Sequence, residues 1–169
     1  MVNSIRRIKR REYRREACGN GSALHIVKPY KIVAREWHNE DTVIDIRGHR
    51  IGGNDIQIIS GPCSVETPIQ MEQAAKAVKD AGVNLMRGGA FKPRTSPYTF
   101  QGVGFEGLEM FRTAADREGL PIVTELLDIR HLDTFLEKKV DVIQIGTRSM
   151  QNFELLREVG KINVPVILK

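Results

Sequence analysis

The 169 residues include only two cysteines and no long apolar run, which argues against a disulfide-rich secreted domain and against a membrane-spanning protein. Cys18 lies near the N-terminus and Cys63 in an apolar segment, so the pair does not resemble the disulfide framework of a small secreted domain, and a reducing cytoplasm fits. No stretch approaches the roughly 18 consecutive apolar residues that a membrane-spanning helix needs. A content of 41% hydrophobic and 28% charged residues is instead typical of a globular domain.

The net charge of +5 is concentrated at one end of the chain. Residues 1–16 carry seven Arg or Lys and two Glu, while the remaining 19 basic and 19 acidic residues cancel. We expect residues 1–27 to form a basic, disordered extension that is solvated. Binding of nucleic acid by this arginine cluster is the alternative.

From residue 56 onward, short apolar segments alternate with amphipathic helical patterns. Segments rich in Val, Ile and Leu predict five parallel strands, at 56–63, 83–87, 121–127, 140–146 and 164–169. Four helices are predicted between them. The first begins at a capping box, Thr67-Pro-Ile-Gln70, and ends at Gly82. Residues 28–55 predict a small cap with a hairpin around Gly48, so the expected organisation is 1–27, 28–55 and a βα domain over 56–169.

The predicted strands end in reactive or ionic residues. Their carboxyl ends carry Cys63, Arg87, Glu125, Gly146-Thr147-Arg148 and Lys169. Active sites of (β/α)8 barrels are built at this end of every strand, whereas doubly wound sheets bind ligands mainly at one switch point. We therefore predict an α/β fold of the (β/α)8 TIM-barrel family, with about the first five strands and four helices present.

The loop after the second predicted strand, residues 88–98, is rich in cations. Glycines allow a ligand to approach the backbone, and Pro93 and Pro97 restrict where Lys92 and Arg94 can lie. Arginine binds phosphate or carboxylate through forked donors, and lysine adds a compact charge. The loop thus suits two anionic groups; a solvated basic loop is the alternative.

Four motifs in this order resemble 3-deoxy-D-arabino-heptulosonate 7-phosphate (DAHP) synthase of the short microbial branch. They are Ile59-Ser-Gly-Pro-Cys-Ser-Val-Glu66, Leu85-Met-Arg-Gly-Gly-Ala-Phe-Lys-Pro-Arg-Thr-Ser-Pro-Tyr98, Gln144-Ile-Gly-Thr-Arg148 and Gln151-Asn-Phe153. The resemblance covers roughly residues 28–169. The related KDO 8-phosphate synthases, which make an eight-carbon product, typically have Lys-Ala-Asn-Arg where this chain has Lys92-Pro-Arg94, so the seven-carbon product is preferred.

The resemblance implies condensation of phosphoenolpyruvate with erythrose 4-phosphate, the entry step of the shikimate pathway. The residues implied to bind phosphoenolpyruvate are Arg87, Lys92, Gly146, Thr147, Arg148 and Lys169, with Arg87 and Lys92 catalytic. Arg94, Thr95 and Ser96 would hold the sugar phosphate. Cys63 would be one of four ligands to a divalent metal such as Mn²⁺ or Fe²⁺. Thr147 departs from the family, which usually has alanine there.

Each assignment has a structural alternative. Cys63 could be an inert buried thiol, and Arg148 and Lys169 could be ordinary strand-end charges. Glu125 could orient groups around the site or be purely structural. The four histidines, His25, His38, His49 and His131, match no ligand position and are expected to be surface or packing residues.

The chain stops after the fifth predicted strand, whereas a complete barrel needs about 250 residues. We expect the first half of a barrel, which lacks the remaining metal ligands of the family and pairs as a homo-oligomer or with a complementary chain. A non-catalytic anion-binding or assembly half-barrel is the alternative function.

The 169-residue chain alone is therefore expected to be inactive. Purified chain with phosphoenolpyruvate, erythrose 4-phosphate and Mn²⁺ should release no phosphate above a protein-free control. Clear turnover would contradict this expectation.

Overall fold

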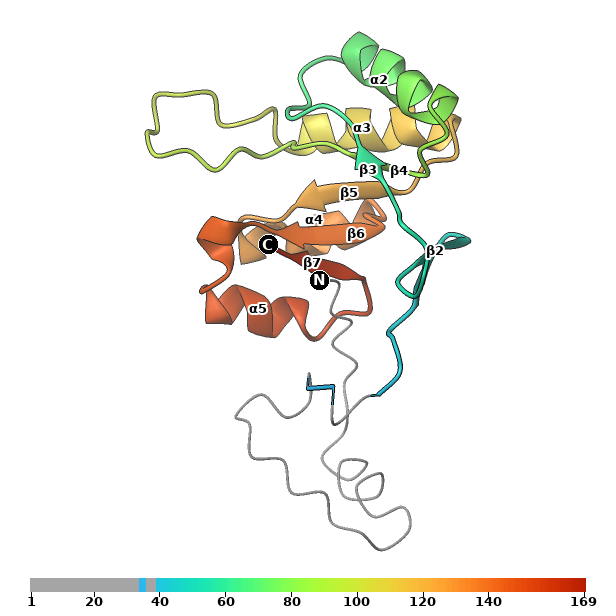
Figure 1. Cartoon of the computed structure of the whole chain (residues 1–169). Coiled ribbons are helices and arrows are strands. Elements are labelled where there is room, and N and C mark those ends of the chain that lie inside the picture. Colours follow the sequence, from blue (N-terminus) through green and yellow to red (C-terminus); the bar gives the residue numbers. More distant parts are fainter. Residues whose placement is uncertain (1–33, 36–38) are drawn as a thin grey trace, which may run out of the picture.

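The computed structural model describes residues 34–35 and 39–169 and centres on a five-stranded parallel sheet (Figure 1). In hydrogen-bonded order the strands are β3 (Ile59–Ser60), β4 (Leu85–Arg87), β5 (Ile122–Glu125), β6 (Val142–Ile145) and β7 (Val166–Leu168). Every neighbouring pair is parallel. Each strand lies inside a segment predicted from its apolar residues, so the predicted parallel series is confirmed.

The first predicted strand was too long at both ends. Ile56 is 92% exposed, and pairing ends at Ser60, so Cys63 lies in the following loop and does not end a strand. Gly61 has a φ of +146°, and Pro62 has no backbone N–H to donate, which together explain why the ladder stops there.

Four helices join the strands, as predicted: α2 (Pro68–Asp80), α3 (Phe105–Arg117), α4 (Leu132–Glu137) and α5 (Phe153–Val159). Short 3-10 turns, η2 (Ile129–His131) and η3 (Thr147–Ser149), follow β5 and β6. None of the described helices combines the length and apolar content that a bilayer crossing requires.

The ends of α2 follow the predicted capping chemistry with one change. The Thr67 hydroxyl accepts the Gln70 N–H at 3.2 Å, but the Gln70 side chain accepts the N–H of Glu66 instead of that of Thr67. At the other end Gly82 has a φ of +72°. Its N–H bonds to the Lys79 carbonyl at 2.9 Å and the Val83 N–H bonds to the Val78 carbonyl at 3.1 Å, which together form a Schellman motif.

The predicted hairpin is present, with β1 (Ile44–Ile46) antiparallel to β2 (His49–Ile51). Arg47 and Gly48 both have positive φ, 52° and 89°, as a two-residue type I′ turn requires. The predicted extension 1–27, with Cys18 and His25, lies outside the described residues, and so do residues 28–33 and 36–38 of the predicted cap segment.

The two faces of the sheet have different partners. One face packs on the helices through a core that includes Met86, Ile122 and Ile143. The other face contributes Leu85, Val123 and Val142, with Ile59 and Ile167, to a smaller cluster completed by Ile44, Ile46 and Ile51 of the hairpin. The hairpin therefore plugs the helix-free face, and Figure 1 shows it at the opposite end of the strands from the long loop after β4.

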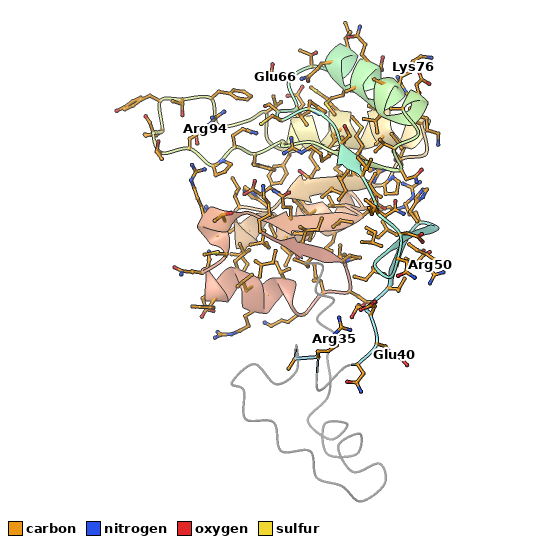
Figure 2. The ribbon with its side chains drawn as sticks, in the orientation of Figure 1. Arg35, Glu40, Arg50, Glu66, Lys76 and Arg94 are labelled. Carbon is orange, nitrogen blue, oxygen red and sulfur yellow. The ribbon has the colours of Figure 1, made fainter. Side chains whose placement is uncertain are left out.

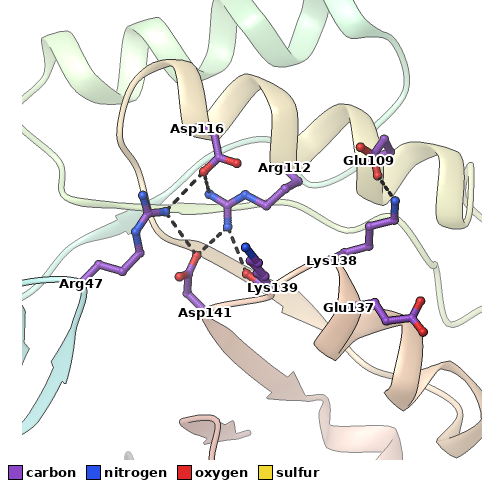
Figure 3. A pocket seen from close by; sticks show the side chains of 8 residues that line it. All are labelled: Arg47, Glu109, Arg112, Asp116, Glu137, Lys138, Lys139 and Asp141. Carbon is purple, nitrogen blue, oxygen red and sulfur yellow. Dashed lines mark hydrogen bonds and ion pairs between the residues drawn. The ribbon is translucent and has the colours of Figure 1, made fainter.

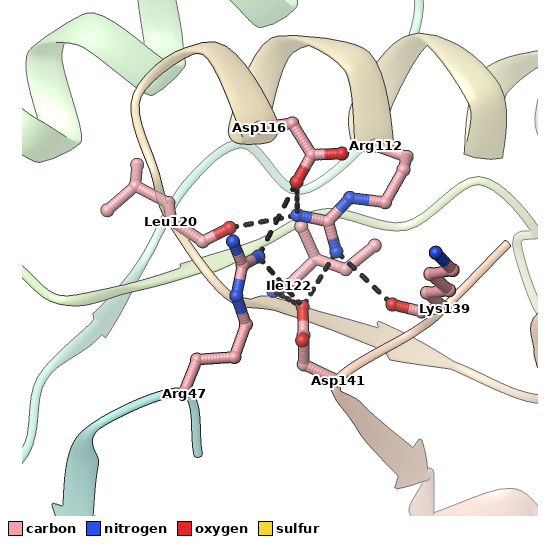
Figure 4. Close-up of polar contacts among 7 residues, drawn as sticks. All are labelled: Arg47, Arg112, Asp116, Leu120, Ile122, Lys139 and Asp141. Atoms are coloured by element: carbon pink, nitrogen blue, oxygen red, sulfur yellow. Dashed lines mark hydrogen bonds and ion pairs between the residues drawn. The ribbon is translucent and has the colours of Figure 1, made fainter.

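A buried arginine joins α3 to the start of β6. Arg112 is 8% exposed and donates to Asp141 at 2.7 Å, to Asp116 at 2.6 Å, and to the carbonyls of Leu120 and Lys139 at 3.1 and 3.2 Å (Figure 4). Because its charge is both paired and hydrogen-bonded, burial of this guanidinium is tolerated.

The hairpin turn reaches the same cluster. Arg47 lies 3.5 Å from Asp116 and 3.9 Å from Asp141. These side chains line a groove of about 570 Å³, in which Lys138 also pairs with Glu109 (Figure 3). Acidic and basic groups are matched at this amino-terminal end of the sheet.

Replacement of Asp141 by asparagine should destabilise the fold. Asp141 also accepts the Ile122 N–H at 2.8 Å, so its loss leaves Arg112 without one carboxylate and weakens the entry to β5. We expect a loss of about 3 kcal/mol in the free energy of unfolding, measured by urea denaturation.

The matched control is Glu158→Gln, which removes a solvent-exposed pair with Lys161 and should cost less than about 1 kcal/mol. Equal free energies for Asp141→Asn and the unmodified chain would show that the Arg112 cluster does not stabilise the fold.

Candidate functional site

The pleat of the strands places the predicted site residues on the hairpin-packed face. Side chains alternate between the two faces of the sheet. Residues two positions after the strand residues that pack on the hairpin therefore share their face. At that spacing the strands carry Arg87, Glu125, Gln144 and Lys169. Lys169 continues β7, because its N–H bonds to the Ile145 carbonyl at 3.0 Å. The carboxyl ends of the strands thus bring together polar residues above an apolar floor.

Glycine lets the loop after β3 lie directly against β4. A side chain at Gly61 would overlap the Arg87 carbonyl oxygen, and one at Gly89 would come within 2.9 Å of the Cys63 carbonyl oxygen. The Arg87 guanidinium donates to the Pro62 carbonyl at 3.1 Å. Arg87 is therefore oriented by a neutral partner.

Lys92 and Cys63, predicted for different roles, are in direct contact. The Lys92 ammonium donates to the Cys63 carbonyl at 2.7 Å and to its Sγ at 3.2 Å. The hydrogen bond and the positive charge of Lys92 lower the pKa of the Cys63 thiol; burial opposes this, and Arg87 adds a smaller lowering effect. Cys63 is exposed, so the alternative of an inert buried thiol is wrong.

The cationic loop is closed at its base and structured at its tip. At the base the Lys92 N–H bonds to the Gln101 carbonyl, and the Gly104 N–H to the Ala90 carbonyl, both at 2.9 Å. At the tip the Ser96 carbonyl accepts the hydroxyl of Thr99 at 2.8 Å and the side-chain amide of Gln101 at 3.0 Å. Hydrogen bonds within the loop hold Ser96, which was predicted to bind phosphate.

Two further arginines donate to carbonyls of this loop. Arg94 donates through Nε to the Phe100 carbonyl at 3.2 Å, and Figure 2 shows it on the projecting loop. Arg148, from η3 after β6, donates to the Pro93 carbonyl at 3.2 Å. The loop after β4 is thereby joined to the segment after β6. Thr95 is exposed and Thr147 begins η3.

Among the residues that the structure describes, no carboxylate cancels the charges of these cations. Within the described residues, no ion pair to a carboxylate involves Arg87, Lys92, Arg94, Arg148 or Lys169. The first four donate to backbone carbonyls instead, which orient a cation without neutralising it. Such an arrangement suits phosphate and carboxylate ligands.

Glu125 is packed against the end of β6. A side chain at Gly146 would overlap the Glu125 carboxylate and force it to shift, so glycine here leaves room for the carboxylate in its present position. Gln144, its partner in the strand register, donates to Glu125 at a long 3.5 Å. The sequence prediction overlooked Gln144, although its polar side chain in an apolar strand could have indicated it.

The described residues do not form a complete metal centre. They contain no cluster of three or more His, Cys, Asp or Glu side chains that could hold a metal ion. Cys63 is the candidate ligand, and Lys92 contacts its sulfur.

An aromatic cluster beside the loop was also overlooked. His131 packs on Phe91 at a ring distance of 4.5 Å, in agreement with its prediction as a packing residue. Phe91 is the one aromatic residue among the cations of residues 87–94, and this pattern could have indicated that it packs partly buried against the core.

Comparisons with known proteins agree on one family. The DAHP synthetase I family matches residues 37–169. The phospho-2-dehydro-3-deoxyheptonate aldolase of Thermotoga maritima is 50% identical over 88% of this chain and 44% of its own length. A 2-dehydro-3-deoxyphosphooctonate aldolase of Caulobacter vibrioides is 32% identical over 63% of this chain and 40% of its own length.

Solved structures give the same result. The crystal structure of the Thermotoga maritima DAHP synthase aligns with a TM-score of 0.79 and 45% identity, over 96% of this chain and 47% of that chain. A truncated form of the same enzyme aligns with a TM-score of 0.72 and 42% identity, over 82% of this chain and 49% of that one. The chain thus spans about half the length of the relatives it matches.

The contact between Lys92 and Cys63 predicts unusual thiol reactivity. Because its pKa is lowered, the Cys63 thiol forms the reactive thiolate at a lower pH than an ordinary thiol does. Its alkylation by iodoacetamide should therefore reach half of the maximal rate at a lower pH than that of an ordinary thiol. Lys92→Met removes the main cause and should move this midpoint upward. Peptide-resolved mass spectrometry distinguishes Cys63 from Cys18.

The control is Lys76→Met, on the exposed surface of α2, which should leave the midpoint unchanged. Identical midpoints for Lys92→Met and the unmodified chain would mean that the ammonium does not act on the thiol.

Proposed function

Because this chain belongs to the DAHP synthetase I family, we propose that its carboxyl-end site serves the condensation of phosphoenolpyruvate with erythrose 4-phosphate. The products are the seven-carbon sugar acid phosphate and inorganic phosphate. The observation that carries the proposal is the set of cations held by carbonyls and left without carboxylate partners among the described residues. Both substrates are phosphorylated and one is also a carboxylate, so a site for both requires such uncancelled charge.

Phosphoenolpyruvate is assigned to the inner cations. Arg87 and Lys92 both contact the loop after β3, since they donate to the carbonyls of Pro62 and Cys63 respectively. Arg148 donates to the carbonyl of Pro93, the residue after Lys92 in the loop after β4. These residues, with Gly146, Thr147 and Lys169, would bind its phosphate and carboxylate.

Erythrose 4-phosphate is assigned to the outer part of the loop. Arg94 and Thr95 are exposed there and Ser96 is half-buried. A phosphate at this position would be held away from the inner cations, so each anion would have its own donors. The aldehyde carbon would then extend inward toward phosphoenolpyruvate.

Catalysis in this proposal depends on positioning and charge. A carbon–carbon bond forms between the methylene carbon of phosphoenolpyruvate and the aldehyde carbon, and the aldehyde oxygen gains negative charge. Arg87 and Lys92 would hold the two reactants together and stabilise the developing charge from fixed positions. Phosphate leaves after water adds to the former enol carbon.

The divalent metal implied by the family resemblance finds one candidate ligand here, the Cys63 thiolate. A site of this kind needs about four ligands, so a complete centre does not fit the described residues alone. A bound metal would act as a Lewis acid on the aldehyde. What this chain contributes is a thiol with a lowered pKa, which favours the thiolate form that a metal binds.

Synthesis of the eight-carbon homologue is the alternative function. Relatives named for that product are 26–32% identical to this chain, against 50% for the seven-carbon enzyme. Pro93 also favours the seven-carbon product, because it stands where the eight-carbon enzymes typically carry a different pair of residues. A four-carbon and a five-carbon aldehyde phosphate, compared in a binding assay, would separate the two.

We further propose that the five strands are part of a (β/α)8 barrel. The hairpin plug on one face and helices on the other support this fold. Among the described residues, β3 and β7 each have one unpaired edge, and Ile58 and Leu168 nearby are 60% and 41% exposed. Further strands, a second copy or a complementary chain would cover these edges.

The proposal predicts that the chain binds phosphoenolpyruvate. Lys92→Met should weaken binding by roughly ten- to hundredfold, because a hydrogen bond to a charged group contributes about 1.5–3 kcal/mol. Isothermal titration calorimetry at two salt concentrations measures both the affinity and its expected decline with ionic strength.

Lys76→Met removes the same charge from the surface of α2 and should bind like the unmodified chain. If both variants lose affinity equally, the site does not lie at the carboxyl ends of the strands. If the unmodified chain binds no phosphoenolpyruvate at low salt, the assignment of the inner cations is wrong.

A further inference from the structure

Three aromatic rings from separate segments meet at the base of the cationic loop. Phe91 follows β4, Phe105 begins α3, and His131 ends η2 after β5. The ring of Phe91 stacks on His131 at 4.5 Å with an interplanar angle of 30° and meets Phe105 edge-on at 5.2 Å. Phe105 and His131 also meet edge-on, at 4.9 Å. Each ring therefore contacts the other two, and Phe135 in the core is a third aromatic neighbour of Phe91, at 6.1 Å.

The cluster is connected directly to the site. Phe91 is the residue before Lys92, and the Lys92 side chain contacts Cys63. The Lys92 N–H also closes the loop on Gln101 at 2.9 Å. The position of the Phe91 ring therefore determines where the Lys92 backbone lies relative to Cys63.

The His131 imidazole acts through its ring face. Its Nδ1 is buried without a hydrogen-bond partner among the described residues, so the stack on Phe91 orients the ring. The turn that carries it is held separately: the Asp128 carboxylate accepts the Arg130 N–H at 2.9 Å, and the His131 N–H bonds to the Asp128 carbonyl at 3.1 Å. A hydrogen-bonded turn thus holds His131 against Phe91 at the base of the loop after β4.

We propose that His131 is a positioning residue for Lys92. Its ring, with Phe105, clamps Phe91 and so holds the Lys92 ammonium against Cys63 in the loop after β3. The inference rests on the proposed function for its ligand, phosphoenolpyruvate, but the clamp itself is a property of the loop. Removal of the ring should leave the fold intact and allow the loop base to move.

The test compares His131→Ala with His131→Phe, which keeps an aromatic face and removes both ring nitrogens. An aromatic pair contributes about 0.5–1.5 kcal/mol, so His131→Ala should raise the dissociation constant for phosphoenolpyruvate by roughly two- to tenfold. It should also speed amide hydrogen exchange at Phe91 and Lys92 and leave exchange within α2 unchanged. His131→Phe should restore both properties.

Ile129→Ala is the matched control, because Ile129 lies on the same turn and is 41% exposed. It should change neither property. Equal binding and equal exchange for His131→Ala and the unmodified chain would overturn the proposal. So would faster exchange throughout the chain, which indicates a merely structural role. If His131→Ala does not fold, Phe105→Leu removes another wall of the clamp and should give the same local result.

The two proposals fail differently. If the unmodified chain binds no phosphoenolpyruvate, the proposed function falls, while local exchange at Lys92 still decides the role of His131. If binding is normal and His131→Ala leaves local exchange unchanged, the clamp is wrong and the proposed function stands.

Discussion

The alternation of side chains along five parallel strands is the constraint on which the rest of the structure depends. Successive side chains point to opposite faces of the sheet. The residue two positions after one on the hairpin-packed face therefore lies on the same face. Leu85 is buried against the hairpin, and Arg87 continues the same face into the site. Val123 and Glu125 repeat this relation on β5. Each of these strands thus supplies both an apolar floor and a polar group above it.

The arginines at the two ends of the sheet have different kinds of partner. At the amino-terminal end Arg112 is buried with Asp116 and Asp141, so its charge is compensated and stabilises the fold. At the carboxyl end Arg87 and Arg148 donate to neutral carbonyls, which fix their direction and preserve their charge. Because only the carboxyl end has cations without carboxylate partners among the described residues, anions are expected at that end.

Local signals in the sequence were sufficient for the elements of the fold. Thr67 caps the start of α2 through its hydroxyl, while Gly82 and Gly48 adopt the positive φ that the end of α2 and the hairpin turn require. The prediction failed where a boundary depends on a neighbour. Ile56 is apolar yet exposed, because no strand or helix of the described chain lies against it to bury it.

The sequence by itself determined the order of strands and helices, the cationic composition of the loop and the family resemblance, because these depend on residue type and short-range spacing. Tertiary structure alone decided which groups meet. Lys92 contacts Cys63 at a sequence separation of 29 residues, and Arg148 contacts Pro93 at a separation of 55. Likewise Phe91 and His131 join two loops in one stack. Such contacts depend on how strands are ordered and staggered, since a parallel sheet brings the ends of distant segments to one edge.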